Sequence, residues 1–157
     1  MDCTLPLTLE HKKARQHWAK SHLISRMDWD TVVFSDEKKF NLYGLDGFKN
    51  YWRDLRSPPR ETVRRQNGGG LVMVWAAFSA KGKSEMAVLA GSQASEHYVN
   101  TLSKFLLPFA HLHYGTDYTF QQDNASIHTS GSTAKFFEEQ QVKVMKWPAR
   151  SPDLNPI

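Results

Sequence analysis

Two short apolar runs, each followed by an aspartate, constrain the fold of this chain more than any other feature of its sequence. Residues 31–35 lead into Asp36, and residues 118–122 lead into Asp123. The first run is continuous rather than alternating, which is typical of a strand buried on both faces in the middle of a sheet. A carboxylate at the end of a buried strand is held rigidly and still meets solvent, as a ligand of a hard divalent cation must. Asp36 and Asp123 therefore stand at positions that suit ligands of such a cation.

Each aspartate alone is weak evidence for such a site, because an aspartate after a strand is more often a turn former or a helix cap. The pair is more informative. Two carboxylates on adjacent strands can hold two cations about 3.5–4 Å apart, one activating an attacking hydroxyl and the other stabilising the leaving oxygen of a phosphodiester. The surrounding sequence has to decide between these interpretations.

The rest of the pattern predicts one mixed α/β domain. The chain has 157 residues, 40% of them hydrophobic, which suffices for the core of one domain. Residues 8–25 suit a helix with Thr8 as N-cap and a loose apolar stripe of Leu9, Trp18, Leu23 and Ile24. We further expect strands at 31–35, 38–43, 71–79, 84–89, 118–122 and 142–147, and helices at 95–113 and 130–141. This order predicts helices that cover a central sheet.

Residues 44–70 are expected to project from the domain as an extended hairpin or loop. Pro58 and Pro59 remove two hydrogen-bond donors, so this segment cannot be a regular strand pair. Three consecutive glycines at 68–70 close the segment, and they lack the flanking residues of a phosphate-binding loop. We therefore expect the segment to be an insert between two strands.

Basic residues favour a polyanionic partner. The chain has a formal net charge of +4 and an isoelectric point near 9.2. Residues 49–65 contain six basic and two acidic side chains, a net charge of +4, and residues 1–27 contain five basic and two acidic, a net charge of +3. Either stretch could be no more than a solvated face. Tyr51 and Trp52 inside the first one favour a nucleic acid.

Cysteine content and hydropathy limit the cellular compartments in which the protein is expected. Cys3 is the only cysteine, so no internal disulfide can form and a reducing compartment is expected. No window of the sequence approaches the 18 or so apolar residues that a membrane span needs. The expectation is a soluble, intracellular protein without a membrane partner.

Four sequence blocks, in this order, are similar to those of a known family: residues 34–42 (FSDEKKFNL), 69–75 (GGLVMVW), 121–129 (QQDNASIHT) and 151–157 (SPDLNPI). Together they resemble the D-D-E catalytic domain of Tc/mariner-superfamily transposases, over essentially the whole chain. The resemblance implies a ribonuclease H-like fold, a Mg²⁺ or Mn²⁺ requirement, and cut-and-paste transfer of a DNA element by strand cleavage and 3′-hydroxyl attack. In that family the aspartates of the first and third blocks bind metal. The resemblance thus implies a catalytic and metal-binding role for Asp36 and Asp123.

The same resemblance implies partners and a location. DNA, as transposon ends and as target, is the expected substrate, with a possible homodimer or pairing with an intact transposase, in the nucleus. The insert at 44–70 resembles a segment that in relatives reaches toward the partner subunit and DNA. A two-helix DNA-reading region, which the family places ahead of the catalytic domain, is not expected within residues 1–157.

A third family ligand, a glutamate, would follow Ile157 directly, since the family separates it from the second aspartate by 34 residues and 157 − 123 = 34. We expect two ligands to give a weak second metal site and low or absent transfer activity. An extension carrying the glutamate and its helix is expected to raise Mn²⁺-dependent nicking in a full-length context. Asp153 is expected to be a turn or cap residue. Glu37 is a poor substitute because neighbours along a strand point to opposite faces.

Rival functions remain open at this stage. One is a catalytically inactive remnant that binds DNA or pairs with an intact transposase, and another is a hydrolytic nuclease on the same core. His128 lies close to Asp123 in sequence, and two interpretations of it stay open. One is a role in the mechanism, and the favoured one is a hydrogen-bonding residue at a helix entry, with Thr129 or Ser130 as the cap. His111 and His113 lack further ligands at zinc spacing.

Overall fold

A computed structural model describes residues 7–42, Arg56 and residues 70–157. The described elements, in chain order, are α1 (Leu9–Ile24), β1 (Val32–Asn41), β2 (Leu71–Ser79), β3 (Gly82–Lys83), β4 (Ala87–Leu89), α2 (Ser95–Thr101), α3 (Leu107–Tyr114), β5 (Thr119–Gln121), α4 (Gly131–Glu139) and β6 (Lys143–Val144). Short 3₁₀ turns lie at Trp29–Thr31 and Pro152–Leu154. The predicted mixture of a central sheet with helices is confirmed.

Strand β1 is the centre of the sheet. Within the described residues the strand order is β3-β2-β1-β5-β6, with β4 also paired to β2. Val32 and Val33 are fully buried, as the continuous apolar run predicts for a strand covered on both faces. The separate strand expected at 38–43 is wrong, because β1 runs without a break to Asn41 and pairs antiparallel with β2 from Phe34 to Asn41.

The return strand after β2 is broken in two. The predicted strand at 71–79 is confirmed. Of the strand expected at 84–89 only Ala87–Leu89 is a strand, β4, and β3 at Gly82–Lys83 lies just before the predicted start. Phe78 pairs with Lys83, but Trp75 pairs with Ala87, so the returning chain gains one residue between these pairs. Ser84 lies in the gap, and its hydroxyl accepts a hydrogen bond from the backbone N–H of Ala77. This is a bulge, which interrupts strand pairing locally.

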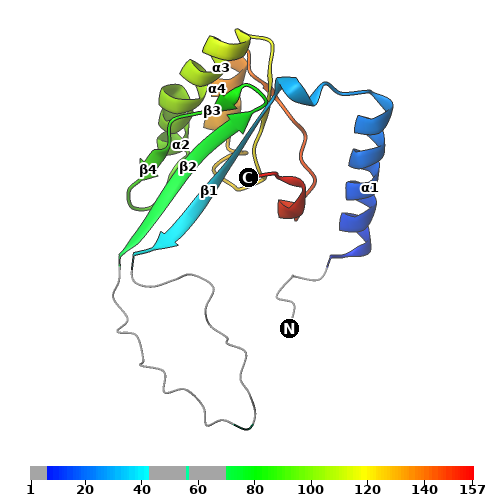
Figure 1. The fold of residues 1–157 in the computed structure, drawn as a ribbon, viewed down its shortest axis with the longest axis horizontal. Helices are drawn as coiled ribbons and strands as arrows, with labels where there is room; N and C mark the ends of the chain where they lie inside the picture. The colour runs from blue at the N-terminus through cyan, green and yellow to red at the C-terminus, as the bar shows by residue number, and fades with distance from the viewer. Residues whose placement is uncertain (1–6, 43–55, 57–69) are drawn as a thin grey trace.

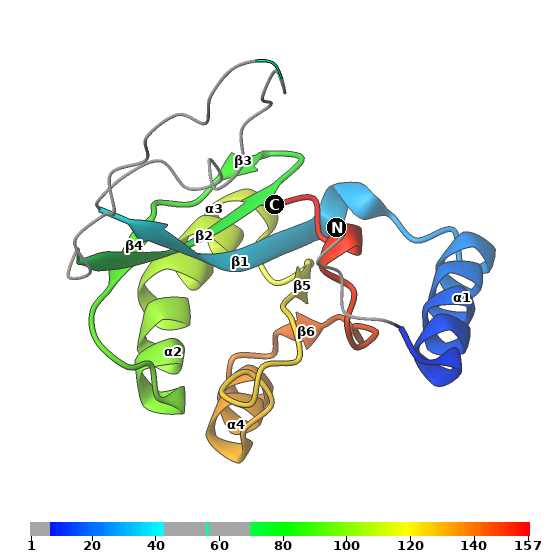
Figure 2. The ribbon, with the colours of Figure 1, turned by 90° about the horizontal axis from the view of Figure 1, so that it is seen from below.

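The helix predicted at 95–113 is confirmed as α2 and α3, joined by a π-helical turn at Leu102–Leu106. Pro108 follows that turn and has no N–H to donate back along the helix, a common cause of such irregularity. Helices α2, α3 and α4 lie on one side of the sheet, and α1 lies apart from them (Figures 1 and 2). On the other face the C-terminal segment reaches β1, where Asn155 donates to the carbonyl of Ser35.

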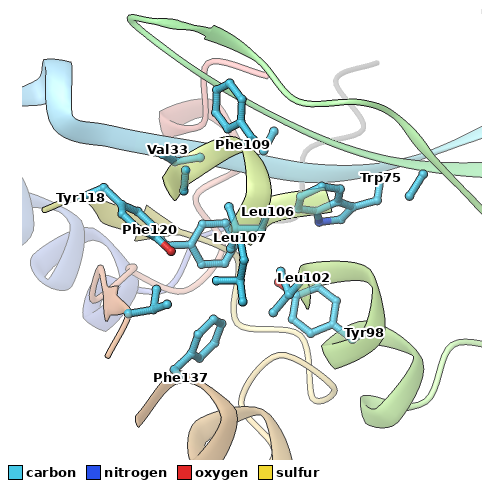
Figure 3. Close-up of a cluster of buried hydrophobic side chains, with 14 residues drawn as sticks. Val33, Trp75, Tyr98, Leu102, Leu106, Leu107, Phe109, Tyr118, Phe120 and Phe137 are labelled. Atoms are coloured by element: carbon cyan, nitrogen blue, oxygen red, sulfur yellow. The ribbon is translucent and has the colours of Figure 1, made fainter. Parts of the chain in front are cut away.

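The core fills the space between the sheet and helices α2 to α4. Trp75 and Phe120 project from the sheet, and Leu102 and Leu106 project from the helix, all four at 0% exposure. Figure 3 shows these side chains in one cluster with Phe137 of α4. This packing fixes β1 and β5 against a rigid layer.

Helix α1 begins as predicted, but it does not use the predicted apolar stripe. Thr8 is the N-cap, and its hydroxyl accepts the N–H of His11. Leu9, Leu23 and Ile24 are 68%, 79% and 83% exposed. The stripe is therefore wrong, except for Trp18.

A polar and aromatic face attaches α1 to the C-terminal segment. The indole N–H of Trp18 donates to the carbonyl of Lys146 at 2.7 Å, and its ring meets the edge of the Trp147 ring at 5.1 Å. Arg15 donates two hydrogen bonds to the Asp153 carboxylate, at 2.7 and 2.5 Å. These contacts replace the apolar burial that a helix of this length ordinarily uses.

Several expectations fall on residues that the structure does not describe. The insert at 44–70 lies outside the described residues except for Arg56 and Gly70, and so do Tyr51 and Trp52. Among the described helices, none has the length and apolar character to cross a membrane.

Two leucines on the α2–α3 helix test the core. Leu102→Ala should lower the free energy of unfolding by about 2–5 kcal/mol, because Leu102 is fully buried and the truncation leaves a cavity. Leu112, 80% exposed, is the control, and Leu112→Ala should change stability by less than about 0.5 kcal/mol. Urea unfolding followed by circular dichroism measures both, and equal effects would contradict the packing in Figure 3.

Candidate active site

Asp36 lies in the middle of β1, not at its end. The expectation that Asp36 terminates the strand is wrong, since β2 pairs with β1 through Asp36 and on to Asn41. The strand that ends close to Asp36 is β5, the neighbour of β1 on its other side. The parallel pairing of β1 with β5 stops at Phe34 and Gln121. Asp36 therefore emerges at an edge created by the end of β5.

Asp123 follows β5 at the same edge. Its Oδ1 accepts a hydrogen bond from the backbone N–H of Ala125 at 2.9 Å, an Asx turn that fixes the carboxylate as the chain leaves the strand. Its side chain is 56% exposed. Strand β5 thus brings Asp123 beside Asp36 while leaving the carboxylate open to solvent.

Both aspartates line one pocket of about 400 Å³. The rest of the lining comes from the end of β5 with the loop after it and from the C-terminal segment: Gln121, Asn124, Ala125, Trp147, Pro148, Ala149, Arg150, Ser151, Pro152 and Asn155. Two amides hold that segment in place, since Asn155 donates to the carbonyl of Ser35 at 3.0 Å and Asn124 donates to that of Trp147 at 2.9 Å. The structure therefore brings the two predicted ligands together.

The two carboxyl groups have opposite electrostatic environments. Burial raises the pKa of Asp36, and the charges of Glu37 and Asp123 raise it further, although the N–H of Glu37 and the charge of His128 act in the other direction. A hydrogen bond from His128 lowers the pKa of Asp123, and the N–H of Ala125 adds to this effect. Mutual repulsion is expected of two carboxylates that await a cation.

His128 is the residue whose role the sequence analysis understated. Its ring is 4% exposed, with Nδ1 at 2.5 Å from Asp123 Oδ1 and Nε2 at 3.3 Å from Glu37 Oε1. The first contact is a hydrogen bond, and the second is an ion pair without hydrogen-bond alignment. Burial lowers the pKa of His128, but the two carboxylates outweigh it and raise the pKa to about 9. The predicted cap at Ser130 is confirmed.

Glu37 stands on the face opposite to Asp36, as strand alternation predicts. It does not line the pocket, and it reaches the pocket only through His128. The Tyr98 ring packs on His128 with centroids 4.1 Å apart, and its hydroxyl donates to Gln122 Oε1 at 2.7 Å. A network of polar groups behind the sheet thus holds Asp123. Only two features of the sequence pointed to this network: the acidic residue next to Asp36 and the histidine five residues after Asp123.

Asp153 lies outside the pocket lining and pairs with Arg15. This agrees with its interpretation as a residue of the loop rather than a ligand. Within the part of the chain that the structure describes, no group of three or more His, Cys, Asp or Glu side chains is placed to hold a metal ion. The candidate ligand set consists of the two aspartates.

Comparison with known proteins identifies relatives of this site and fold. Residues 31–157 match the family model of the DDE superfamily endonuclease. The chain is 47% identical over 151 residues to the transposable element Tc3 transposase of Caenorhabditis elegans, covering 96% of this chain and 45% of that protein. It is 35% identical to the Tc1 transposase of the same organism, covering 96% and 57%. The chain therefore spans about half the length of the curated relatives it matches.

Solved structures show the same fold. The mariner Mos1 paired end complex with Mg superimposes with a TM-score of 0.82 at 22% identity, covering 99% of this chain and 48% of that chain. The catalytic domain of Mos1 mariner transposase gives a TM-score of 0.70 at 17% identity, covering 98% and 68%. The predicted ribonuclease H-like fold is confirmed.

The two aspartates should differ in their effect on the stability of the metal-free chain. Asp36→Asn should raise the melting temperature at pH 7 by about 2 °C, because it removes a charge that burial and two neighbouring carboxylates disfavour. Asp123→Asn should lower it by a similar amount, because it removes the anion that pairs with His128. Differential scanning fluorimetry in a chelator measures both changes. Shifts of the same sign would contradict the charge arrangement described here.

The raised pKa of His128 makes the metal-free fold sensitive to alkali. A raised pKa means that the charged ring stabilises the fold fully below about pH 6.5 and that this contribution is lost as pH rises through about 9. From pH 6 to pH 10 the wild type should lose on the order of 3 kcal/mol more stability than His128→Asn. Urea unfolding across this range tests the loss, and an NMR titration giving a ring pKa at or below 6.5 would refute it.

Proposed function

The chain belongs to the DDE superfamily endonuclease family, and from this membership we propose that it is the catalytic domain of a Tc/mariner-like transposase, which cleaves and transfers DNA strands with Mg²⁺ or Mn²⁺. The observation that carries the proposal is the shared pocket of Asp36 and Asp123. The names of the relatives support it, since both nematode proteins are transposases.

The donor groups of the pocket fit a hard divalent cation. Mg²⁺ in proteins commonly binds one or two carboxylates, keeps several waters, and takes further oxygens from substrate phosphates. Asp36 and Asp123 supply the two carboxylates, and the open side of Asp123 leaves room for waters and substrate. Mos1 structures described as paired end complexes with Mg and with Mn add support from a protein of the same fold.

Each residue has a distinct task in this proposal. Asp36 and Asp123 hold the cation, which when bound would activate the attacking hydroxyl and stabilise the leaving oxygen. His128, braced by Glu37, keeps the Asp123 carboxylate ionised and oriented toward the pocket. Arg150, the only basic residue among the lining residues, offers a guanidinium to a phosphate.

DNA is the proposed partner. Helix α1 carries Lys12, Lys13 and Lys20, all exposed, and contacts the segment that forms one wall of the pocket. A basic helix beside an acidic metal site suits a polyanion that crosses the site while the cation screens the carboxylates. Pairing with a second copy or an intact transposase, and a nuclear location, belong to the same proposal, and the paired-end Mos1 complexes support the pairing.

Nicking of supercoiled plasmid tests the function. In Mn²⁺ the chain should convert supercoiled plasmid to open circles, and Asp36→Asn and Asp123→Asn should reduce this to the metal-free background. Asp117→Asn is the matched control, since Asp117 is exposed and lies outside the pocket lining, and it should nick like the wild type.

Binding separates this function from its rival. Both pocket variants should still bind DNA with an affinity that falls steeply as salt rises. Nicking that survives Asp36→Asn would show that the ligands are wrong. DNA binding with no nicking by any form of the chain would favour the inactive, DNA-binding remnant.

A further inference from the structure

Gln121 is a fully buried polar side chain without a partner. It is 0% exposed, and neither its amide oxygen nor its amide nitrogen has a hydrogen-bond partner among the described residues. Leaving such a group unpaired costs as much as desolvating it, so nearly all buried amides in native proteins are satisfied. A side chain with both ends unpaired therefore calls for an explanation.

The position of Gln121 places the residue at the candidate active site. Gln121 is the last residue of β5 and pairs with Phe34 of β1. Its neighbour Phe120 points to the other face, where it packs on Phe137 with ring centroids 5.7 Å apart. Alternation along the strand puts Gln121 on the face of Asp36, and Gln121 lines the same pocket as both aspartates.

The next residue shows that the fold can satisfy a glutamine at this point of the chain. Gln122, 7% exposed, accepts a hydrogen bond from the Tyr98 hydroxyl at 2.7 Å and donates one to the carbonyl of His128 at 3.0 Å. The two adjacent glutamines thus differ in the hydrogen bonding of their side-chain amides. The amide behind the sheet is paired within the protein, whereas the amide on the pocket face has no partner among the described residues.

We propose that Gln121 positions the hydrated divalent cation held by Asp36 and Asp123, with its amide oxygen accepting a hydrogen bond from a water molecule of the cation's hydration shell. This rests on the proposed metal-dependent function. Mg²⁺ and similar ions keep several waters when only two carboxylates bind them, and groups that hydrogen-bond to the ligands of a metal tune its affinity. A neutral amide does so without adding a third negative charge beside two carboxylates that already repel each other.

Stability of the metal-free chain is the first test, with the two glutamines as a matched pair. Gln121→Met removes an unpaired amide and should raise the melting temperature in a chelator by about 3 °C or more. Gln122→Met breaks two buried hydrogen bonds and should lower it by a similar amount. If Gln121→Met destabilises the chain as Gln122→Met does, the Gln121 amide has a partner within the fold and the proposal is overturned.

Affinity for Mn²⁺ alone is the second test, measured by the electron paramagnetic resonance signal of free Mn²⁺. Gln121→Met should weaken binding by about tenfold or more, and Gln121→Glu, which keeps an oxygen acceptor, should bind at least as tightly as the wild type. Unchanged affinity in Gln121→Met, or equal loss in both variants, overturns the role of Gln121 while leaving the metal site intact. No Mn²⁺ binding by the wild type would instead refute the proposed metal site, and the role of Gln121 with it.

Discussion

The parallel pairing of β5 with β1 is the interaction on which the candidate site depends. It covers only Val32 to Phe34, whereas β2 continues along β1 to Asn41. Because one neighbour ends and the other continues, β1 presents Asp36 at an open edge while staying anchored on its other side. The chain leaving β5 turns at the same edge and brings Asp123 to it. The shared pocket of the two aspartates is thus a consequence of strand lengths, and the rigid core behind the sheet keeps those strands in register.

Charge balance follows from the two faces of β1. Successive residues of a strand point to opposite sides, so Asp36 enters the pocket and Glu37 enters the layer behind it. His128 lies in that layer and joins Glu37 to Asp123. One carboxylate of the pocket is therefore stabilised as an anion by a buried cation, while the other is left with a raised pKa. The unpaired amide of Gln121 adds a third polar group to the same face. The pocket thus combines an ionised carboxylate, a second carboxyl group with a raised pKa, and an unpaired amide.

The sequence predicts the central strand and the two aspartates because these depend on local pattern. A continuous apolar run identifies β1, and the order of helices and strands identifies the mixed sheet. The strand lengths were harder to predict. The polar residues from Glu37 onward are typical of a strand end, and only their pairing with β2 shows that β1 continues through them. The stripe of α1 failed because Arg15 and Trp18 attach the helix through specific partners 128 to 138 residues away. The role of His128 was understated and Gln121 was missed for the same reason. The contacts of His128, and the lack of contacts at the Gln121 amide, exist only once β1 and β5 are side by side.

A crystal structure of the chain grown with Mn²⁺ is the most direct test of this account. Anomalous scattering locates the ion without reference to the protein coordinates. The account predicts a peak between the carboxylates, with oxygens of both Asp36 and Asp123 coordinating the ion and the Gln121 amide facing one of its waters. A peak elsewhere on the protein, or carboxylates that turn away from each other and leave the pocket without an ion at saturating Mn²⁺, would contradict it.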